Sequence, residues 1–249
     1  MVQAPLLIAA FPSCNIEMHM ANHLAKKMKH KLNVIHIGKC GGGTVELAIM
    51  QSKILAEKFE SVKVTHINKV NYSEQESYLI IIRNPIDRAI SAFNWRYHLV
   101  VESEEQKERF KGEWQILKKY STLNSLSESL YDLDREFLNE KVSREFKAIH
   151  HLRENISFYL STMLRHVCPH QVYGIIKQHS LASDCKLLLG SSIDVQHKNC
   201  GVTTDPLKKE LSKLARLNLR RFLHKDFACI LKLYNLGLLT WNDYELLTR

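Results

Sequence analysis

The stretch that most constrains the fold of this chain is LNVIHIGKCGGGT, which runs from Leu32 to Thr44. Its apolar part, Leu32 to Ile37, is typical of a buried strand, and a helical pattern follows from Val45 onward. Between the two lie Lys39 and three consecutive glycines, which turn the chain tightly and leave main-chain N–H groups uncovered. Because the unpaired N–H groups and the dipole of the following helix add positive charge there, this order predicts a site for a phosphate-like anion.

Hydrophobic runs along the rest of the chain predict three more strands and a series of helices. The strands are expected at 62–67, 78–83 and 171–176, and the continuous apolar run 78–83 suits a strand buried on both faces. Helices are expected at 16–28, 44–59, 103–120, 124–139, 142–164 and 181–189, with one or two more within 206–234. Asn84 and Pro85 are typical of a helix start, as N-cap and first helical residue.

The alternation of strands and helices favours an α/β fold. We expect a single domain, residues 1–249, with a central, mainly parallel β-sheet flanked by helices, since repeats and an obvious linker are lacking. The net charge of +9 favours anionic partners without choosing among them. Six scattered cysteines without a CxxC pair favour a reducing compartment, and no apolar run approaches the roughly 18 residues of a membrane span. These features predict a cytoplasmic protein that does not bind a membrane.

Three charged or ionisable residues, Lys39, His66 and Arg83, each fall at the end of a predicted strand. Ligands of parallel sheets bind at the carboxyl ends of the strands, so we expect these side chains to meet around one ligand. The GxxxxGK[ST] pattern of nucleotide triphosphatases is absent, because Lys39 precedes the glycines, and the buried strand ends in Arg83 rather than a Mg²⁺-binding acid. The pattern predicts two anion subsites that need no metal, one at 39–44 and one at Arg83 with Ser91.

Two segments resemble the PAPS-dependent sulfotransferases (PAPS is 3′-phosphoadenosine 5′-phosphosulfate). The segment from His36 to Thr44 is similar to their 5′-phosphosulfate loop, and IRNPIDRAISAFNW, residues 82–95, resembles their 3′-phosphate motif. In that motif an Arg ends a strand and a Ser lies eight residues later, as Arg83 and Ser91 do here. The family usually has Asp where this chain has Asn84. Residues 173–184 and 197–201 are similar to later segments of bacterial and carbohydrate-type members.

The resemblance implies the P-loop-like sulfotransferase fold, with a nucleotide-binding core at 32–100 and a helical, acceptor-side insert at 102–164. It implies transfer of a sulfuryl group from PAPS, as co-substrate, to a hydroxyl or amine of a small-molecule or glycan acceptor, without a metal. Lys39 is expected to bind PAPS and to stabilise the leaving oxygen, and Arg83, Ser91 and Lys198 to hold the 3′-phosphate. The expected ligands of the 5′-phosphate and sulfuryl group are Cys40, Gly41, Gly42, Gly43 and Thr44. A small-molecule acceptor would suit a natural-product tailoring enzyme.

His66 is the expected general base, because it ends a strand on the ligand side and the ordinary pKa of imidazole suits proton abstraction at neutral pH. In the uronyl 2-O-type branch of the family, a His occupies a comparable place. Glu46 and His36 are the alternatives. His150 and His151 are expected on a solvated helix face, and Cys40 is interpreted as a spacer with an unreactive thiol.

Two other functions stay open. One is a nucleotide-dependent kinase or related phosphoryl transferase, which requires an acidic Mg²⁺ ligand that the sequence does not offer at the strand ends. The other is a non-catalytic nucleic-acid-binding module, which charge alone suggests and which the glycine turn does not need. The favoured reading includes no nucleic-acid partner. Trp95, Tyr97 and Trp114 are possible walls of the acceptor site, and the oligomeric state is open.

Overall fold

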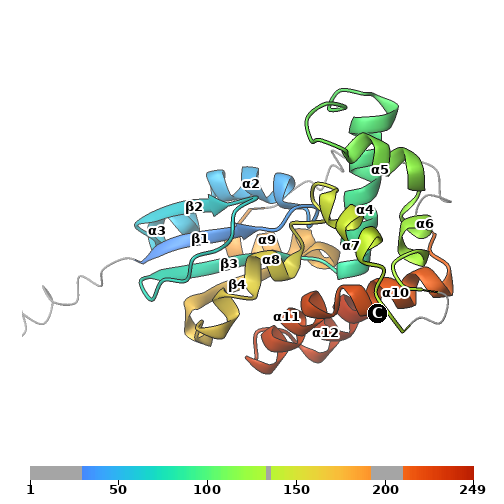
Figure 1. Ribbon diagram of the computed structural model, residues 1–249. Coiled ribbons are helices and arrows are strands. Elements are labelled where there is room, and N and C mark those ends of the chain that lie inside the picture. The colour runs from blue at the N-terminus through green and yellow to red at the C-terminus, as the bar shows by residue number, and fades with distance from the viewer. Residues whose placement is uncertain (1–29, 133–135, 192–209) are drawn as a thin grey trace, which may run out of the picture.

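The computed structural model describes residues 30–132, 136–191 and 210–249 (Figure 1). The predicted helix at 16–28 and the expected phosphate ligand Lys198 lie outside these residues. Within them, no helix is long and apolar enough to cross a membrane.

A four-stranded sheet forms the centre of the structure. Its strands are β1 (Lys31–His36), β2 (Ser61–Thr65), β3 (Glu76–Ile82) and β4 (Val172–Lys177), in the order β2-β1-β3-β4. All three strand pairs are parallel, so the α/β prediction and the four predicted strands are confirmed. Because the strands run in one direction, their carboxyl ends meet along one edge of the sheet.

The strand register places particular residues side by side at that edge. Ile35 of β1 pairs with Thr65 of β2 on one side and with Ile80 of β3 on the other. The next residues along β1 and β2 are therefore His36 and His66, which come together across two neighbouring strands.

Helices cover both faces of the sheet (Figure 1). On one face lie α2 (Gly42–Gln51), α3 (Lys53–Lys58) and α9 (Leu181–Leu189), and on the other lie α8 (Ile156–Leu160), α11 (His224–Asn235) and α12 (Trp241–Thr248). The main hydrophobic core joins both layers to the sheet, and residues 78–82 of β3 are all buried in it, as the apolar run predicts.

The prediction of a single helix at 44–59 is wrong, because the helix is interrupted at Ser52. The Ser52 hydroxyl accepts a hydrogen bond from the Leu55 N–H and donates one to the Leu189 carbonyl oxygen, at 2.7 Å. Serine is a strong N-cap, and this one starts α3 while fastening it to the end of α9. The predicted helix at 181–189 is confirmed, and it ends at Gly190 in the left-handed conformation (φ 66°).

The helix after β3 forms as expected. In α4 (Pro85–Tyr97), the side-chain oxygen of Asn84 accepts hydrogen bonds from the N–H groups of Ile86 and Asp87, at 2.9 and 3.2 Å. The side-chain nitrogen of Asn84 donates to the carbonyl oxygen of Arg249 at 2.9 Å. A π-helical turn, His98–Glu102, continues α4.

The long helices predicted at 103–120, 124–139 and 142–164 are wrong in their boundaries. The structure has shorter ones, α5 (Glu113–Tyr120), α6 (Leu123–Glu128), α7 (Glu140–Ala148) and α8. Gly112 adopts a left-handed φ of 82°, and the side chains of Thr122, Asn139 and Asn155 each cap the helix that follows. These caps override the longer apolar periodicity.

The helical segment has a hydrophobic cluster of its own. In that cluster α4 to α7 pack with α10 (Lys213–Phe222), which begins the C-terminal helices. One or two helices were expected between 206 and 234, and the structure has two there, α10 and α11, but α12 was not predicted. Residues Ile156, Tyr159 and Leu160 of α8 belong to the main core beneath the sheet, so α8 does not share the cluster of the preceding helices.

Candidate functional site

The turn after β1, the end of β3 and one face of α4 come together at the carboxyl edge of the sheet. The Arg83 guanidinium (Nη1) donates to the carbonyl oxygen of Lys39 at 3.5 Å. The Lys39 ammonium stands 4.4 Å from the ring centre of Trp95. Trp95 lies one helical turn beyond Ser91, so the ammonium approaches the same face of α4. The structure therefore brings Lys39, Arg83 and the Ser91 face together, as predicted from the strand ends.

The positive charges at this point are crowded. Burial and the nearby guanidinium groups of Arg83 and Arg88 lower the pKa of Lys39 to about 8. Among residues 30–132, 136–191 and 210–249, no carboxylate forms an ion pair with any of these three cations. The buried carboxyl of Asp226 acts electrostatically on Arg88 without forming an ion pair with it. Cations held close together without a paired carboxylate create a field that attracts an anion.

At the end of β4 the balance of charge is different. Lys177 lies 3.1 Å from an Asp243 oxygen and 3.5 Å from an Asp184 oxygen, so its charge is compensated. The attraction for anions is thus concentrated at β1 and β3.

Within the described residues, three main-chain N–H groups of the glycine turn have no hydrogen-bond acceptor and are left for a ligand. The N–H of Cys40 donates to the Ile37 carbonyl oxygen at 3.2 Å, and that of Thr44 donates to Gly41 at 3.1 Å. The expected set of donors therefore narrows to Gly41, Gly42 and Gly43, which precede or begin α2. The Cys40 side chain is buried and burial raises its pKa to about 11, which agrees with the spacer interpretation.

Position 42 must be a glycine because a neighbouring side chain leaves no room for a Cβ atom. A Cβ atom at this position would lie 1.9 Å from the ring of His36, so the His36 imidazole occupies the space that a side chain at Gly42 would fill. Burial, with the neighbouring His66, lowers the pKa of His36 to about 4 and keeps that ring neutral at physiological pH.

We expect Gly42→Ala to destabilise the protein by about 1–3 kcal/mol, as overpacking in a filled interior does. His36→Ala in the same chain should relieve the clash, so that the double variant loses less than the two single variants together. Urea unfolding of the four proteins measures this coupling. Strictly additive losses would contradict the close packing of Gly42 on His36.

Gly43 is different, because none of the residues that the structure describes requires a glycine there. A Cβ atom would meet none of their atoms within 4 Å, and Gly43 is not among the glycines with positive φ. Glycine early in a helix costs roughly 0.5–1 kcal/mol relative to alanine. An exposed glycine without a structural need is consistent with a ligand that approaches the backbone closely at this point.

His66 is held in one orientation by its neighbour strand. Its Nδ1 lies 2.9 Å from the His36 carbonyl oxygen, and the two rings stack with centres 4.2 Å apart. A carbonyl oxygen only accepts hydrogen bonds, so Nδ1 carries the proton in the neutral ring and Nε2 keeps its lone pair. This is the tautomer that a general base at Nε2 requires.

The prediction that His150 and His151 lie on a solvated helix face is wrong. They follow α7, and His150 is buried against Phe110, with ring centres 4.5 Å apart. His151 is half-buried: a Cβ atom on Gly38 would lie 2.7 Å from its Nδ1, and its ring centre is 6.0 Å from that of His66. Tertiary packing, which one local pattern does not reveal, places this histidine beneath the glycine turn.

Backbone strain is concentrated at the same place. Five non-glycine residues have positive φ in the part of the chain that the structure describes, and three of them are Lys39 (69°), Ile67 (65°) and His151 (65°). Such a φ is costly, most of all for a β-branched residue like Ile67, and strained residues cluster at functional sites. Each of the three is a candidate site residue or is next to one.

Arg88 organises this region, and sequence reasoning missed its role. It is 1% exposed, and its guanidinium (Nη2) donates to the carbonyl oxygens of both His151 and Glu154. The one available signal is its position on the α4 stripe that also carries Ser91 and Trp95. Periodicity alone does not distinguish a stripe that faces a ligand from one that anchors another segment.

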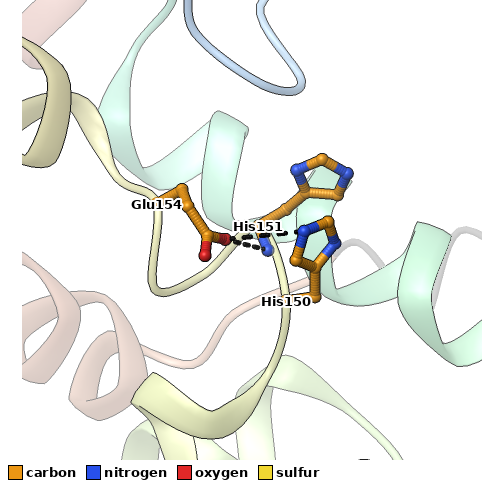
Figure 2. A group of neighbouring side chains, drawn as sticks. All are labelled: His150, His151 and Glu154. Carbon is orange, nitrogen blue, oxygen red and sulfur yellow. Dashed lines mark hydrogen bonds and ion pairs between the residues drawn. The ribbon is translucent and has the colours of Figure 1, made fainter. Parts of the chain in front are cut away.

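His150, His151 and Glu154 form a group with the composition of a metal site. Figure 2 shows the Glu154 carboxylate directed at the His151 main-chain nitrogen, at 2.8 Å, and at the His150 ring, at 3.9 Å. One ligand atom from each residue lies within 4.8 Å of the others, compared with about 3.4 Å for the ligands of a tetrahedral zinc ion. Lys39, Arg88 and Arg153 all act on this group as positive charges, which disfavours a further cation.

The other residues expected at the site are placed as follows. Glu46, an alternative base, is exposed on α2, and Tyr97 stacks on Phe93, with ring centres 6.2 Å apart. Trp114 and Phe110 line a pocket of about 360 Å³ in the helical segment. Through Phe110 and His150 this pocket adjoins the histidines of the site.

Comparison of the chain with protein-family models, with curated proteins and with solved structures finds no match in any of the three. The function therefore has to be argued from the motifs and from the geometry of the site.

Proposed function

We propose that this protein transfers a sulfuryl group from PAPS to a hydroxyl or amine of a small-molecule or glycan acceptor. The observation that carries the proposal is the convergence of Lys39 and Arg83 on the glycine turn, without a carboxylate paired to either among the described residues. PAPS carries two separated anionic groups, and the proposal assigns one of them to the glycine turn and the other to Arg83 with Ser91.

In this proposal each group has one task. The N–H groups of Gly41 to Gly43 bind the 5′-phosphate and sulfuryl oxygens, and Lys39 neutralises the charge that develops on the bridging oxygen as the S–O bond breaks. Arg83 and Ser91 bind the 3′-phosphate. His66 takes the acceptor proton at Nε2 as the acceptor oxygen or nitrogen attacks sulfur in line.

A phosphoryl transferase that uses Mg²⁺ is less well supported. The acidic residues on the two helices that frame the site are Glu46 of α2 and Asp87 of α4, and both are exposed. Metal-assisted phosphoryl transfer needs a carboxylate directed at the phosphates, which these positions do not provide.

Adenosine 3′,5′-bisphosphate, the nucleotide product, tests the proposal directly. A ligand that binds only the native state raises the melting temperature, and a concentration of about 100 times Kd adds about 2.7 kcal/mol of stability. We expect this nucleotide to stabilise the protein in the presence of EDTA, and labelled PAPS to sulfate an acceptor. Stabilisation by ATP with Mg²⁺ and none by the bisphosphate would contradict the proposal.

Gly43→Ala is expected to change stability and binding in opposite directions. The unliganded variant should be more stable by about 0.5–1 kcal/mol, because alanine favours the helix and meets no neighbour. Its affinity for the bisphosphate should fall by about tenfold or more, because the methyl group occupies the approach to the N–H groups. Denaturant unfolding and calorimetric titration of the same protein measure both effects. Unchanged affinity would show that no ligand passes close to Gly43.

The pocket at Phe110 and Trp114 is a candidate position for part of the acceptor. Its aromatic side chains lie beside Lys107, whose ammonium is 5.1 Å from the Trp114 ring centre. Aromatic faces next to ammonium groups suit a sugar or aromatic ring that carries negative charge. Profiling of acceptors with labelled PAPS would identify the class.

A further inference from the structure

The conformation of His151 is imposed by buried charged residues. Its φ of 65° lies in the left-handed region, which is uncommon for residues other than glycine, although histidine adopts it more often than most. The carbonyl oxygen of His151 accepts from Arg88, and its N–H donates to the Glu154 carboxylate at 2.8 Å. Arg88 and Glu154 are each 1% exposed, so two buried ionic groups hold one strained residue. Strain that the surrounding structure enforces in this way points to a use for the side chain.

The His151 side chain lies beneath the glycine turn. Its Nδ1 is buried against Gly38 and has no hydrogen-bond partner among the described residues. Within the same residues Nε2 accepts or donates no hydrogen bond and is not among the buried unpaired nitrogens, so Nε2 is the ring nitrogen that a ligand can reach. The same ring adjoins His66, the proposed base, and is close enough to Lys39 to be affected by its charge, so it is near both groups that are proposed to handle the reacting atoms.

The surroundings keep this imidazole neutral. Burial and the electrostatic effects of the neighbouring His150, Arg88, Lys39 and His66 lower the pKa of His151 to about 2. A neutral imidazole is too weak a base at that pKa to take the acceptor proton, but it still offers one N–H donor. The charged groups that face it are Lys39 from the turn, His66 from the end of β2, Arg88 from α4, and His150 and Glu154 from its own segment.

We propose that His151 is a binding residue for the group being transferred, with its Nε2–H donating to a sulfuryl oxygen of PAPS. This inference rests on the proposed function and adds to it a ligand from the helical segment. Because the bisphosphate product has no sulfuryl group, the contact exists with PAPS and not with the product.

His151→Asn tests this contact, since asparagine tolerates positive φ but its side chain is shorter. Hydrogen bonds to charged groups are among the stronger ones in proteins, so the affinity for PAPS should fall by roughly tenfold to a hundredfold. The affinity for adenosine 3′,5′-bisphosphate should stay within about threefold, a difference below 1 kcal/mol. His170→Asn, an exposed histidine just before the amino end of β4, is the matched control and should change neither affinity.

The outcomes separate this inference from the proposed function. If the wild-type protein binds neither nucleotide, the proposed function fails. If the wild type binds both and His151→Asn binds both equally well, or loses both equally, the role of His151 is overturned.

A second measurement avoids dependence on the variant's fold. Imidazole ¹⁵N spectra of the wild-type protein should show a shift of the His151 Nε2 signal with PAPS that the bisphosphate does not produce. A joint shift of His150 and His151 upon titration with micromolar Zn²⁺ would overturn the inference in favour of a metal site.

Discussion

Lys39→Met is expected to slow sulfuryl transfer by about 10²–10³-fold while making the unliganded protein more stable. The loss of rate follows because, in the proposed mechanism, the ammonium group neutralises the leaving oxygen, and removal of one such electrostatic contact typically costs this much. Methionine keeps the length and apolar character of the side chain, so the packing against Trp95 is largely kept.

The gain in stability follows from the pKa of Lys39. In the folded protein this pKa is about 8, compared with 10.5 for an ordinary lysine. Folding therefore disfavours the charged form, and the resulting cost is fully present below pH 8 and disappears as the pH rises toward 10.5. Methionine carries no charge to desolvate, and we expect a gain of about 1–2 kcal/mol at pH 7 after the lost cation–π contact is included.

The measurement is the difference in unfolding free energy between wild type and Lys39→Met as a function of pH. The difference should be largest near neutral pH and should close at alkaline pH. Lys39→Arg is the matched control, because it keeps a positive charge at this position in a guanidinium group that stays charged at all accessible pH values. A variant that is less stable than the wild type at pH 7 would contradict the account of crowded charges.

His66→Ala is expected to lower turnover at saturating PAPS by about 10²–10⁴-fold, the usual contribution of a general base. The affinity for adenosine 3′,5′-bisphosphate should change by less than about threefold, because His66 is proposed to contact the acceptor and not the nucleotide. Single-turnover assays with a tight-binding acceptor separate this effect on chemistry from an effect on binding.

Added imidazole provides the control for His66→Ala. The variant leaves a space beside the His36 ring and the His36 carbonyl oxygen. Free imidazole that binds there can donate to the carbonyl oxygen and accept a proton on its other nitrogen, so activity should return in part. His36→Ala should be less affected, since its ring supports His66 without supplying the base. A normal rate for His66→Ala would remove this residue from the mechanism.

The elements that could be predicted from sequence are those whose causes are local. The run of residues 78–82 is apolar because β3 is buried on both faces, and Asn84 caps α4 with its own side chain. The meeting of Lys39 and Arg83 was also predictable, because parallel strands end on one side of a sheet.

The parts that escaped prediction depend on contacts between distant segments. Arg88 and His151 are joined by a hydrogen bond but lie 63 residues apart in the sequence, and no spacing rule links two such positions. Gly42 was interpreted only as a phosphate-binding glycine. The structure requires a glycine there because the His36 ring occupies the space that a side chain would fill. The breaks between α5, α6, α7 and α8 come from capping side chains that compete with the helical pattern.

The asparagine at the start of α4 links two distant parts of the chain. Its oxygen caps the helix as an aspartate would, but its amide nitrogen donates to the main chain of Arg249, which an ionised carboxylate cannot do. The end of α12 and the start of α4 are thereby fastened to one another. The consequence of an asparagine in place of an aspartate at position 84 is thus a contact between two distant parts of the fold, the helix after β3 and α12.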